Sequence, residues 1–74
     1  MENRIMTFTE AIQATLEGKR MTNGTETNGE LEELEIIMDC PFMMIARPGQ
    51  KNSSSKIAKT PTVEDVLSGE WREI

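Results

Sequence analysis

Histidine is absent from the 74-residue chain, and cysteine occurs only once. Without histidine the chain lacks the commonest general base and the usual partner of a nucleophilic serine or cysteine, which excludes the usual catalytic triads. The single cysteine, Cys40, allows no intramolecular disulfide and no paired-cysteine metal site, and it favours a reducing cytosol. We therefore expect a protein that is not an enzyme and that uses no cofactor or metal.

Long apolar runs are also missing. No stretch approaches the roughly 20 apolar residues that span a bilayer, and the segment before Thr7 has no apolar region of the kind found in signal peptides. We expect neither secretion nor membrane insertion. A chain of 74 residues forms one domain (1–74), and because so small a core stabilises only marginally, self-association is expected.

The charge of the chain is negative overall and unevenly distributed. A formal net charge of −5 argues against binding to DNA or RNA polymers, because such binding depends on cations that neutralise many phosphates. The acidic residues of 30–35 read most simply as a solvated surface. No acidic residue lies between Asp39 and Glu64. The cations of that stretch are Arg47, Lys51, Lys56 and Lys59.

Two short helices are predicted, one near each end of the chain. Thr7–Glu10 fits a capping box, and apolar residues recur at helical spacing after it, which predicts a helix over about Phe8–Glu17. Thr60-Pro61-Thr62 predicts the start of the second helix, because proline suits the first helical position after a threonine cap. Thr62 with Asp65 offers an alternative cap for the same helix.

The remaining apolar segments predict strands. Their expected ranges are Leu34–Asp39, Phe42–Ala46, Lys56–Lys59 and Trp71–Ile74. A helical start at Glu30 is an alternative for the first of them. The continuously apolar Phe42–Ala46 suggests a strand covered on one face by the helices and on the other by a second subunit. Thr22–Gly29 has two Asn-Gly pairs and is predicted to be a loop.

The expected fold is therefore α+β: a small antiparallel sheet with an N-terminal helix and a C-terminal helix, in a homo-oligomer. Pro41 should lie at a strand start, an edge or a bulge, because it cannot donate to a sheet ladder. Cys40 is expected to be a small buried hydrophobe, and Trp71 a core anchor. The methionines are expected in the core or in subunit contacts.

Anion binding is the positive functional prediction. A helix start presents free amides and a partial positive charge to phosphate, and here it is preceded by Lys56 and Lys59. Cation, hydroxyl and amide donors would converge there. The simpler alternative is that these lysines are solvated surface, and that Lys19 and Arg20 only stabilise the negative end of the first helix.

Two segments carry a family resemblance. Met6–Ile12, continuing to Leu16–Arg20, and Thr60–Trp71 resemble the opening and closing signatures of small phage proteins of the Thoeris anti-defence two family. Pro41–Ile45 resembles the central strand of that family. Members commonly carry an aromatic residue after the first helix and another before the closing helix, where this chain has Thr22–Gly24 and Lys59.

The resemblance implies a viral sponge in the host cell cytoplasm, often a homotetramer, which sequesters nucleotide second messengers of bacterial immunity without cleaving them. Related anti-CBASS sponges take up cyclic dinucleotides such as cyclic GMP-AMP. The ligand is expected to lie between subunits. Phosphates would be held by Arg47, Lys56 and Lys59, with Thr60 and Thr62 donating from the helix start and with Lys19, Arg20 and Asn23 closing over the ligand.

A second hypothesis belongs to another class of function. The acidic region Glu30–Glu35 could face a basic surface of a host defence factor, so that the protein acts as a protein–protein inhibitor. Neutralising these glutamates would separate the two hypotheses, since nucleotide capture should survive the change.

Overall fold

Helix α1 (Phe8–Leu16) begins where the capping box predicts it. The computed structural model describes residues 5–46 and 56–74. The Thr7 hydroxyl accepts a hydrogen bond from the Glu10 amide at 3.2 Å, and the Glu10 carboxylate accepts one from the Thr7 amide at 3.0 Å. The helix ends at Leu16 with Glu17 as its C-cap, and Gly18 follows with φ +95°, a left-handed conformation that glycine adopts without steric cost.

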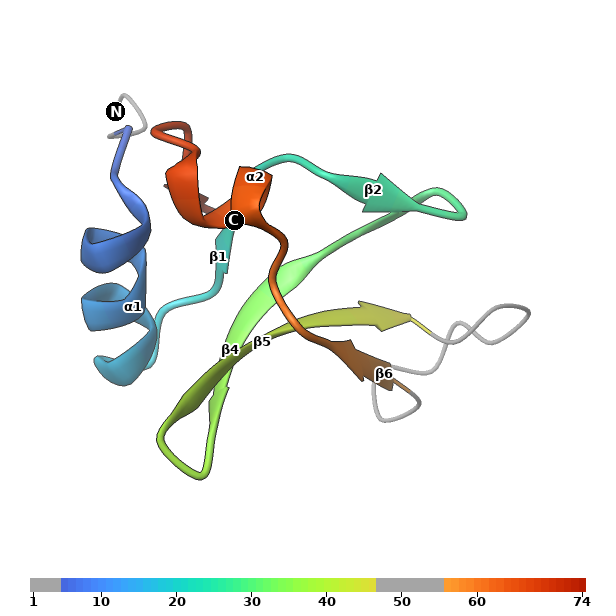
Figure 1. Cartoon of the computed structure of the whole chain (residues 1–74), viewed down its shortest axis with the longest axis horizontal. Helices are drawn as coiled ribbons and strands as arrows, with labels where there is room; N and C mark the ends of the chain where they lie inside the picture. The colour runs from blue at the N-terminus through green and yellow to red at the C-terminus, as the bar shows by residue number, and fades with distance from the viewer. Residues whose placement is uncertain (1–4, 47–55) are drawn as a thin grey trace.

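A five-stranded antiparallel sheet follows, in the order β6-β5-β4-β1-β7 (Figure 1). Its strands are β1 (Met21–Thr22), β4 (Glu33–Ile37), β5 (Cys40–Ala46), β6 (Lys56–Lys59) and β7 (Arg72–Glu73). A separate hairpin pairs β2 (Glu26–Thr27) with β3 (Glu30–Leu31), and the short helix α2 (Val63–Leu67) lies between β6 and β7 in the chain. The α+β class, the two helices and the antiparallel sheet are thus confirmed.

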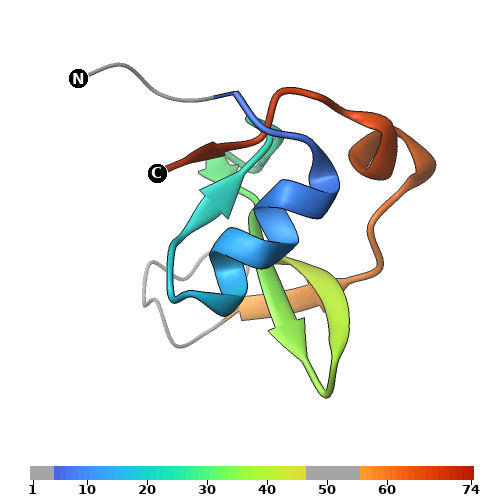
Figure 2. The ribbon, with the colours of Figure 1, turned by 90° about the vertical axis from the view of Figure 1, so that its left-hand side faces the viewer.

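One face of the sheet carries the core, and α1 packs across it (Figure 2). The buried apolar residues are Ala11, Ala14, Met21, Leu34, Met43, Ile45 and Trp71. Trp71 is fully buried, and its ring centroid lies 5.5 Å from that of Phe8. The prediction of Trp71 as a core anchor is confirmed, and so is that of Met21 and Met43 as core residues. We call this side of the sheet the core face.

The opposite side of the sheet, the open face, has no described helix packed over it. The pairing register and strand alternation place side chains of all five strands on this face. They are Glu33, Glu35 and Ile37 of β4, Cys40, Phe42, Met44 and Ala46 of β5, Lys56 and Ala58 of β6, Thr22 of β1 and Arg72 of β7, with Arg20 next to β1. Phe42 and Met44 are only half-buried, whereas Met43 between them is fully buried. Within one subunit, β5 is therefore fully covered on one face only.

The segment from Met21 to Asp39 departs most from the sequence prediction. The strand expected at Leu34–Asp39 ends at Ile37, because Met38 (φ 51°) and Asp39 (φ 65°) form the tight turn into β5. No helix starts at Glu30. The expected loop Thr22–Gly29 begins inside β1 and contains β2. Both strands have only two residues, which is too short to show an apolar alternation.

Cys40 is exposed, so the prediction that it is buried is wrong. Cys40 pairs with Ile37 directly beside the turn and, like Phe42 two residues later, points to the open face rather than to the core. Pro41 is the second residue of β5 and pairs with Ile36, while the described pairing of β5 with β6 begins only at Met43. Pro41 thus has a strand neighbour on one side alone, which agrees with the expected edge-like position.

The turn at Met38–Asp39 predicts a stabilising substitution. Both residues have positive φ, and Met38 is 90% exposed. Replacing the pair by Asn–Gly, the sequence that such turns prefer, should raise the free energy of unfolding by about 1 kcal/mol. Urea denaturation measures the change. A lower midpoint that depends on protein concentration would instead show that Met38 packs against another subunit.

Candidate functional site

The candidate cations Lys56 and Lys59 lie on opposite faces of the sheet. Lys56 pairs with Ala46 and Lys59 with Met43, and residues three apart in a strand point to opposite sides. Lys56 is therefore on the open face, whereas Lys59 projects from the core face at the edge of the sheet. The structure does not bring the predicted residues into one cluster, but divides them between two.

The open-face cluster is centred on Glu33. The Arg20 guanidinium donates two hydrogen bonds to its carboxylate, from Nη2 at 2.6 Å and from Nε at 3.0 Å, and Lys56 Nζ lies 3.6 Å from Oε2. The hydrogen bonds from Arg20 hold the pKa of Glu33 below its usual value against the effect of burial, and Lys56 adds to the lowering. Glu33 in turn raises the pKa of Arg20.

The second cluster contains Lys59 and Glu32. Lys59 Nζ lies 3.1 Å from Glu32 Oε2, which also accepts a hydrogen bond from the Thr27 hydroxyl at 2.6 Å. Glu32 is 0% exposed, so the prediction that the acidic residues of 30–35 are solvated surface is wrong for this glutamate. Its Oε1 has no hydrogen-bond partner. The Lys59–Glu32 pair thus fixes the β2–β3 hairpin to the edge strand β6.

Asp65 occupies the start of α2, where the anion was expected. Its Oδ2 accepts from the Thr62 amide at 2.9 Å, its Oδ1 accepts from Asn23 Nδ2 at 2.8 Å, and its own amide donates to the Thr62 hydroxyl at 3.1 Å. Burial acts to raise the pKa of Asp65, but these hydrogen bonds, with the charge of Lys59, lower it. Thr62 and Asn23 are therefore already engaged, and the alternative cap, Thr62 rather than Thr60, is the one formed.

The other predicted site residues lie apart from these clusters. Lys19 follows α1 and its Nζ is 3.8 Å from Glu17 Oε1. Thr60 is exposed just after β6. Arg47 lies outside the described residues. Within 5–46 and 56–74, no group of three or more His, Cys, Asp or Glu residues is arranged to hold a metal ion, and no helix is long and apolar enough to cross a bilayer.

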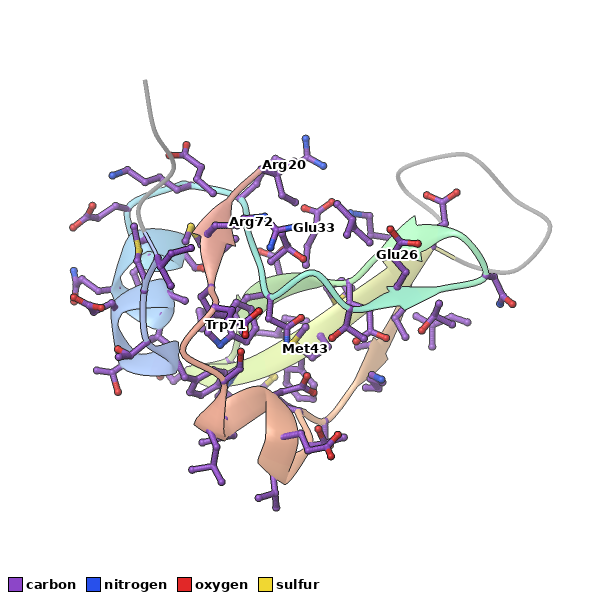
Figure 3. All side chains as sticks on the ribbon, turned by 90° about the horizontal axis from the view of Figure 1, so that it is seen from above. Arg20, Glu26, Glu33, Met43, Trp71 and Arg72 are labelled. Atoms are coloured by element: carbon purple, nitrogen blue, oxygen red, sulfur yellow. The ribbon has the colours of Figure 1, made fainter. Side chains whose placement is uncertain are left out.

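Sequence reasoning missed Arg72 as a candidate binding residue. It pairs with Thr22 in the register of β7 with β1, and it lies beside Arg20 and Glu33 (Figure 3). The strand predicted at Trp71–Ile74 was the available signal: because neighbouring side chains of a strand point to opposite faces, Arg72 must point away from the core once Trp71 is placed in it. What the sequence lacked was any indication that Arg20 and Glu33 would lie on that face as well.

The two lysines should differ in their effect on stability. Lys59→Ala leaves the buried Glu32 with only Thr27 as a partner, so we expect a loss of about 2 kcal/mol or more in the free energy of unfolding. Lys56→Ala is the matched control, because Arg20 still holds Glu33, and it should cost less than about 1 kcal/mol. Urea denaturation of both variants tests this, and equal losses would contradict it.

Stability should also depend on acid pH through Glu33. Its pKa is lowered in the folded protein from an ordinary value of 4.5, so its stabilising contribution is complete above 4.5 and is lost as the pH falls below that value through the folded pKa. Arg20→Ala removes the main cause. The stability difference between the wild type and this variant should therefore shrink as the pH falls below 4.5; a difference that stays constant down to pH 2.5 would contradict the assignment.

Comparison of the chain with protein-family models, with curated proteins and with solved structures finds no match in any of the three.

Proposed function

We propose that the protein captures a cyclic nucleotide second messenger without cleaving it, and so acts as a viral sponge against bacterial immunity in the host cell cytoplasm. The best candidate ligand is a cyclic dinucleotide such as 3′3′-cyclic GMP-AMP. The observation that carries this proposal is the convergence of Arg20 and Lys56 on the open face of the sheet, next to the half-buried Phe42 and Met44.

The cations of this face are positioned before a ligand arrives. Glu33 holds Arg20 and Lys56 within hydrogen-bonding and ion-pairing distance of one carboxylate. The Arg20 side chain is still 65% exposed, and a guanidinium has five N–H donors, of which Glu33 uses two. Phosphate oxygens can therefore bind the remaining donors while Glu33 keeps the guanidinium oriented, which reduces the entropy lost on binding.

An apolar surface for the bases lies beside these cations. Met44 pairs with Glu33 on one side and with Ala58 on the other, and Phe42 pairs with Glu35. Nucleotide bases stack on aromatic side chains that project from an open sheet. Phe42 and Met44 can contact the base of a nucleotide whose phosphate is held by Arg20 and Lys56.

The proposal includes self-association through the open face, with a homotetramer as the preferred assembly. A two-fold axis at a subunit interface would repeat Arg20, Lys56 and Phe42 symmetrically, which suits a ligand with two phosphates and two bases. The exposed Ala58 and the half-buried Met44 would gain cover from the second subunit, as the apolar sequence of β5 suggests.

The carboxylates favour capture over cleavage. The lowered pKa values of Glu33 and Asp65 make these groups poor proton acceptors at neutral pH, and both are already engaged with donors of the chain. The alternative function, inhibition of a host protein through Glu30–Glu35, has less support. Glu32 of that region is fully buried and Glu33 is held by Arg20.

Calorimetric titration with cyclic dinucleotides and cyclic ADP-ribose variants tests the proposal. We expect one ligand of the panel to bind tightly, with a stoichiometry of one ligand per two subunits if the site lies between them, and to be recovered unchanged after denaturation. Arg20→Ala should weaken binding about tenfold or more, because hydrogen bonds to a charged group are lost.

Lys19→Ala is the matched control for this experiment. Lys19 is a cation next to Arg20 in the sequence, but its described ion pair is with Glu17, so its replacement should leave affinity within about twofold. Absence of binding across the panel, or recovery of a hydrolysed ligand, would overturn the proposed function.

A further inference from the structure

We infer that Arg72 is a second phosphate-binding residue of the open face, and that it takes a phosphate group separate from the one held by Arg20 and Lys56. This inference rests on the proposed function for the identity of the ligand. The existence of an anion site at Arg72 is independent of the proposed function, because it follows from the surroundings of the Arg72 side chain.

The register places Arg72 on the same face as Arg20. Arg72 pairs with Thr22, and the Ile74 amide donates to the Arg20 carbonyl at 2.8 Å, so that β7 runs alongside this part of the chain. Figure 3 shows the Arg72 label close to those of Glu33 and Arg20, and alternation after the buried Trp71 directs Arg72 away from the core face. Arg72 is half-buried at this position.

The guanidinium of Arg72 lies against the backbone of Gly24. A Cβ atom at Gly24 would lie only 3.2 Å from Nη1 and 3.4 Å from Nη2. Gly24 has φ +88°, and its amide donates to the Thr22 hydroxyl at 3.0 Å, while that hydroxyl donates to the Glu32 carbonyl at 2.8 Å. The loop is thereby held in a conformation that leaves room for the guanidinium, so the absence of a side chain at Gly24 positions Arg72.

No acceptor satisfies Arg72 within the described parts of the chain. Arg20 and Lys56 share the Glu33 carboxylate, Lys59 has Glu32 and Lys19 has Glu17. Arg72 takes part in none of the described ion pairs or side-chain hydrogen bonds. No guanidinium nitrogen of Arg72 is among the buried polar atoms that lack a partner, so its donors face solvent. A phosphate can accept two parallel hydrogen bonds from them. The group of Arg20, Lys56 and Glu33 carries one uncompensated positive charge, and Arg72 adds a second on the same face.

The two groups of cations suit a ligand with two phosphates. Arg20 and Lys56 lie on either side of Glu33, whereas Arg72 belongs to the edge strand β7. A cyclic dinucleotide presents two phosphodiesters separated by two sugars, so one phosphate can reach each group.

The test uses the whole protein and two variants of Arg72. Arg72→Gln removes the charge and should weaken binding of the cyclic dinucleotide about 10- to 100-fold, as expected for losing hydrogen bonds to a charged group. Arg72→Lys keeps the charge and should recover part of the affinity. Gly24→Ala keeps Arg72 but displaces its guanidinium, and it should also weaken binding. Urea midpoints of all three variants show whether they fold.

A second measurement keeps the anion site testable if a variant fails to fold or if no nucleotide binds. Inorganic pyrophosphate is titrated into the wild-type protein while the Nε–Hε resonance of Arg72 is followed by NMR. A saturable shift of this resonance supports the site even when no cyclic nucleotide binds, in which case only the proposed function fails. Two outcomes would overturn the inference. One is the absence of any shift of the Arg72 resonance with pyrophosphate. The other is an unchanged nucleotide affinity in a folded Arg72→Gln variant when Arg20→Ala does weaken binding.

Discussion

The Asp65 carboxylate joins parts of the chain that are far apart in sequence, and the geometry of the C-terminal third depends on it. Its two oxygens accept hydrogen bonds from Asn23 and from the Thr62 amide, and its backbone carbonyl accepts one from Trp71 Nε1 at 3.2 Å. Asp65 therefore starts α2, fixes the loop after β1 and orients the indole that fills the core. Arg72 follows Trp71 directly, so the placement of the indole also determines where that guanidinium can lie.

The features predicted correctly from the sequence are those set by local hydrogen bonds or by burial of one large side chain. Thr7 with Glu10 forms a capping box whose partners are three residues apart, so its pattern is visible in the sequence. For α2 the preferred cap, Thr60 with Pro61 as the first helical residue, was wrong, and the alternative cap of Thr62 with Asp65 is the one formed. Lys56–Lys59 forms a strand with the predicted bounds. The turn at Met38–Asp39 was missed because methionine is not typical of a position with positive φ and Met38 continues the apolar run of the strand, although aspartate is common in such turns.

The candidate site was predicted less well, because it depends on the face to which each side chain points. Nothing near Glu32 in the sequence distinguishes it from Glu33, yet Glu32 is fully buried and paired with Lys59, whereas Glu33 lies on the opposite face with Arg20 and Lys56. The pairing register, set by long-range contacts, decides between these outcomes. The cations named from the sequence are therefore present, but most of them have a carboxylate partner within the chain.

The opposite orientation of Lys56 and Lys59 has a consequence for how such a protein can evolve. Lys59 serves the fold, because it neutralises a buried carboxylate, whereas Lys56 lies on a surface that the fold does not need to cover. Substitutions on the open face can then change which molecule is recognised without loss of the native structure. This separation allows new binding specificities to be sampled on the open face at almost constant stability.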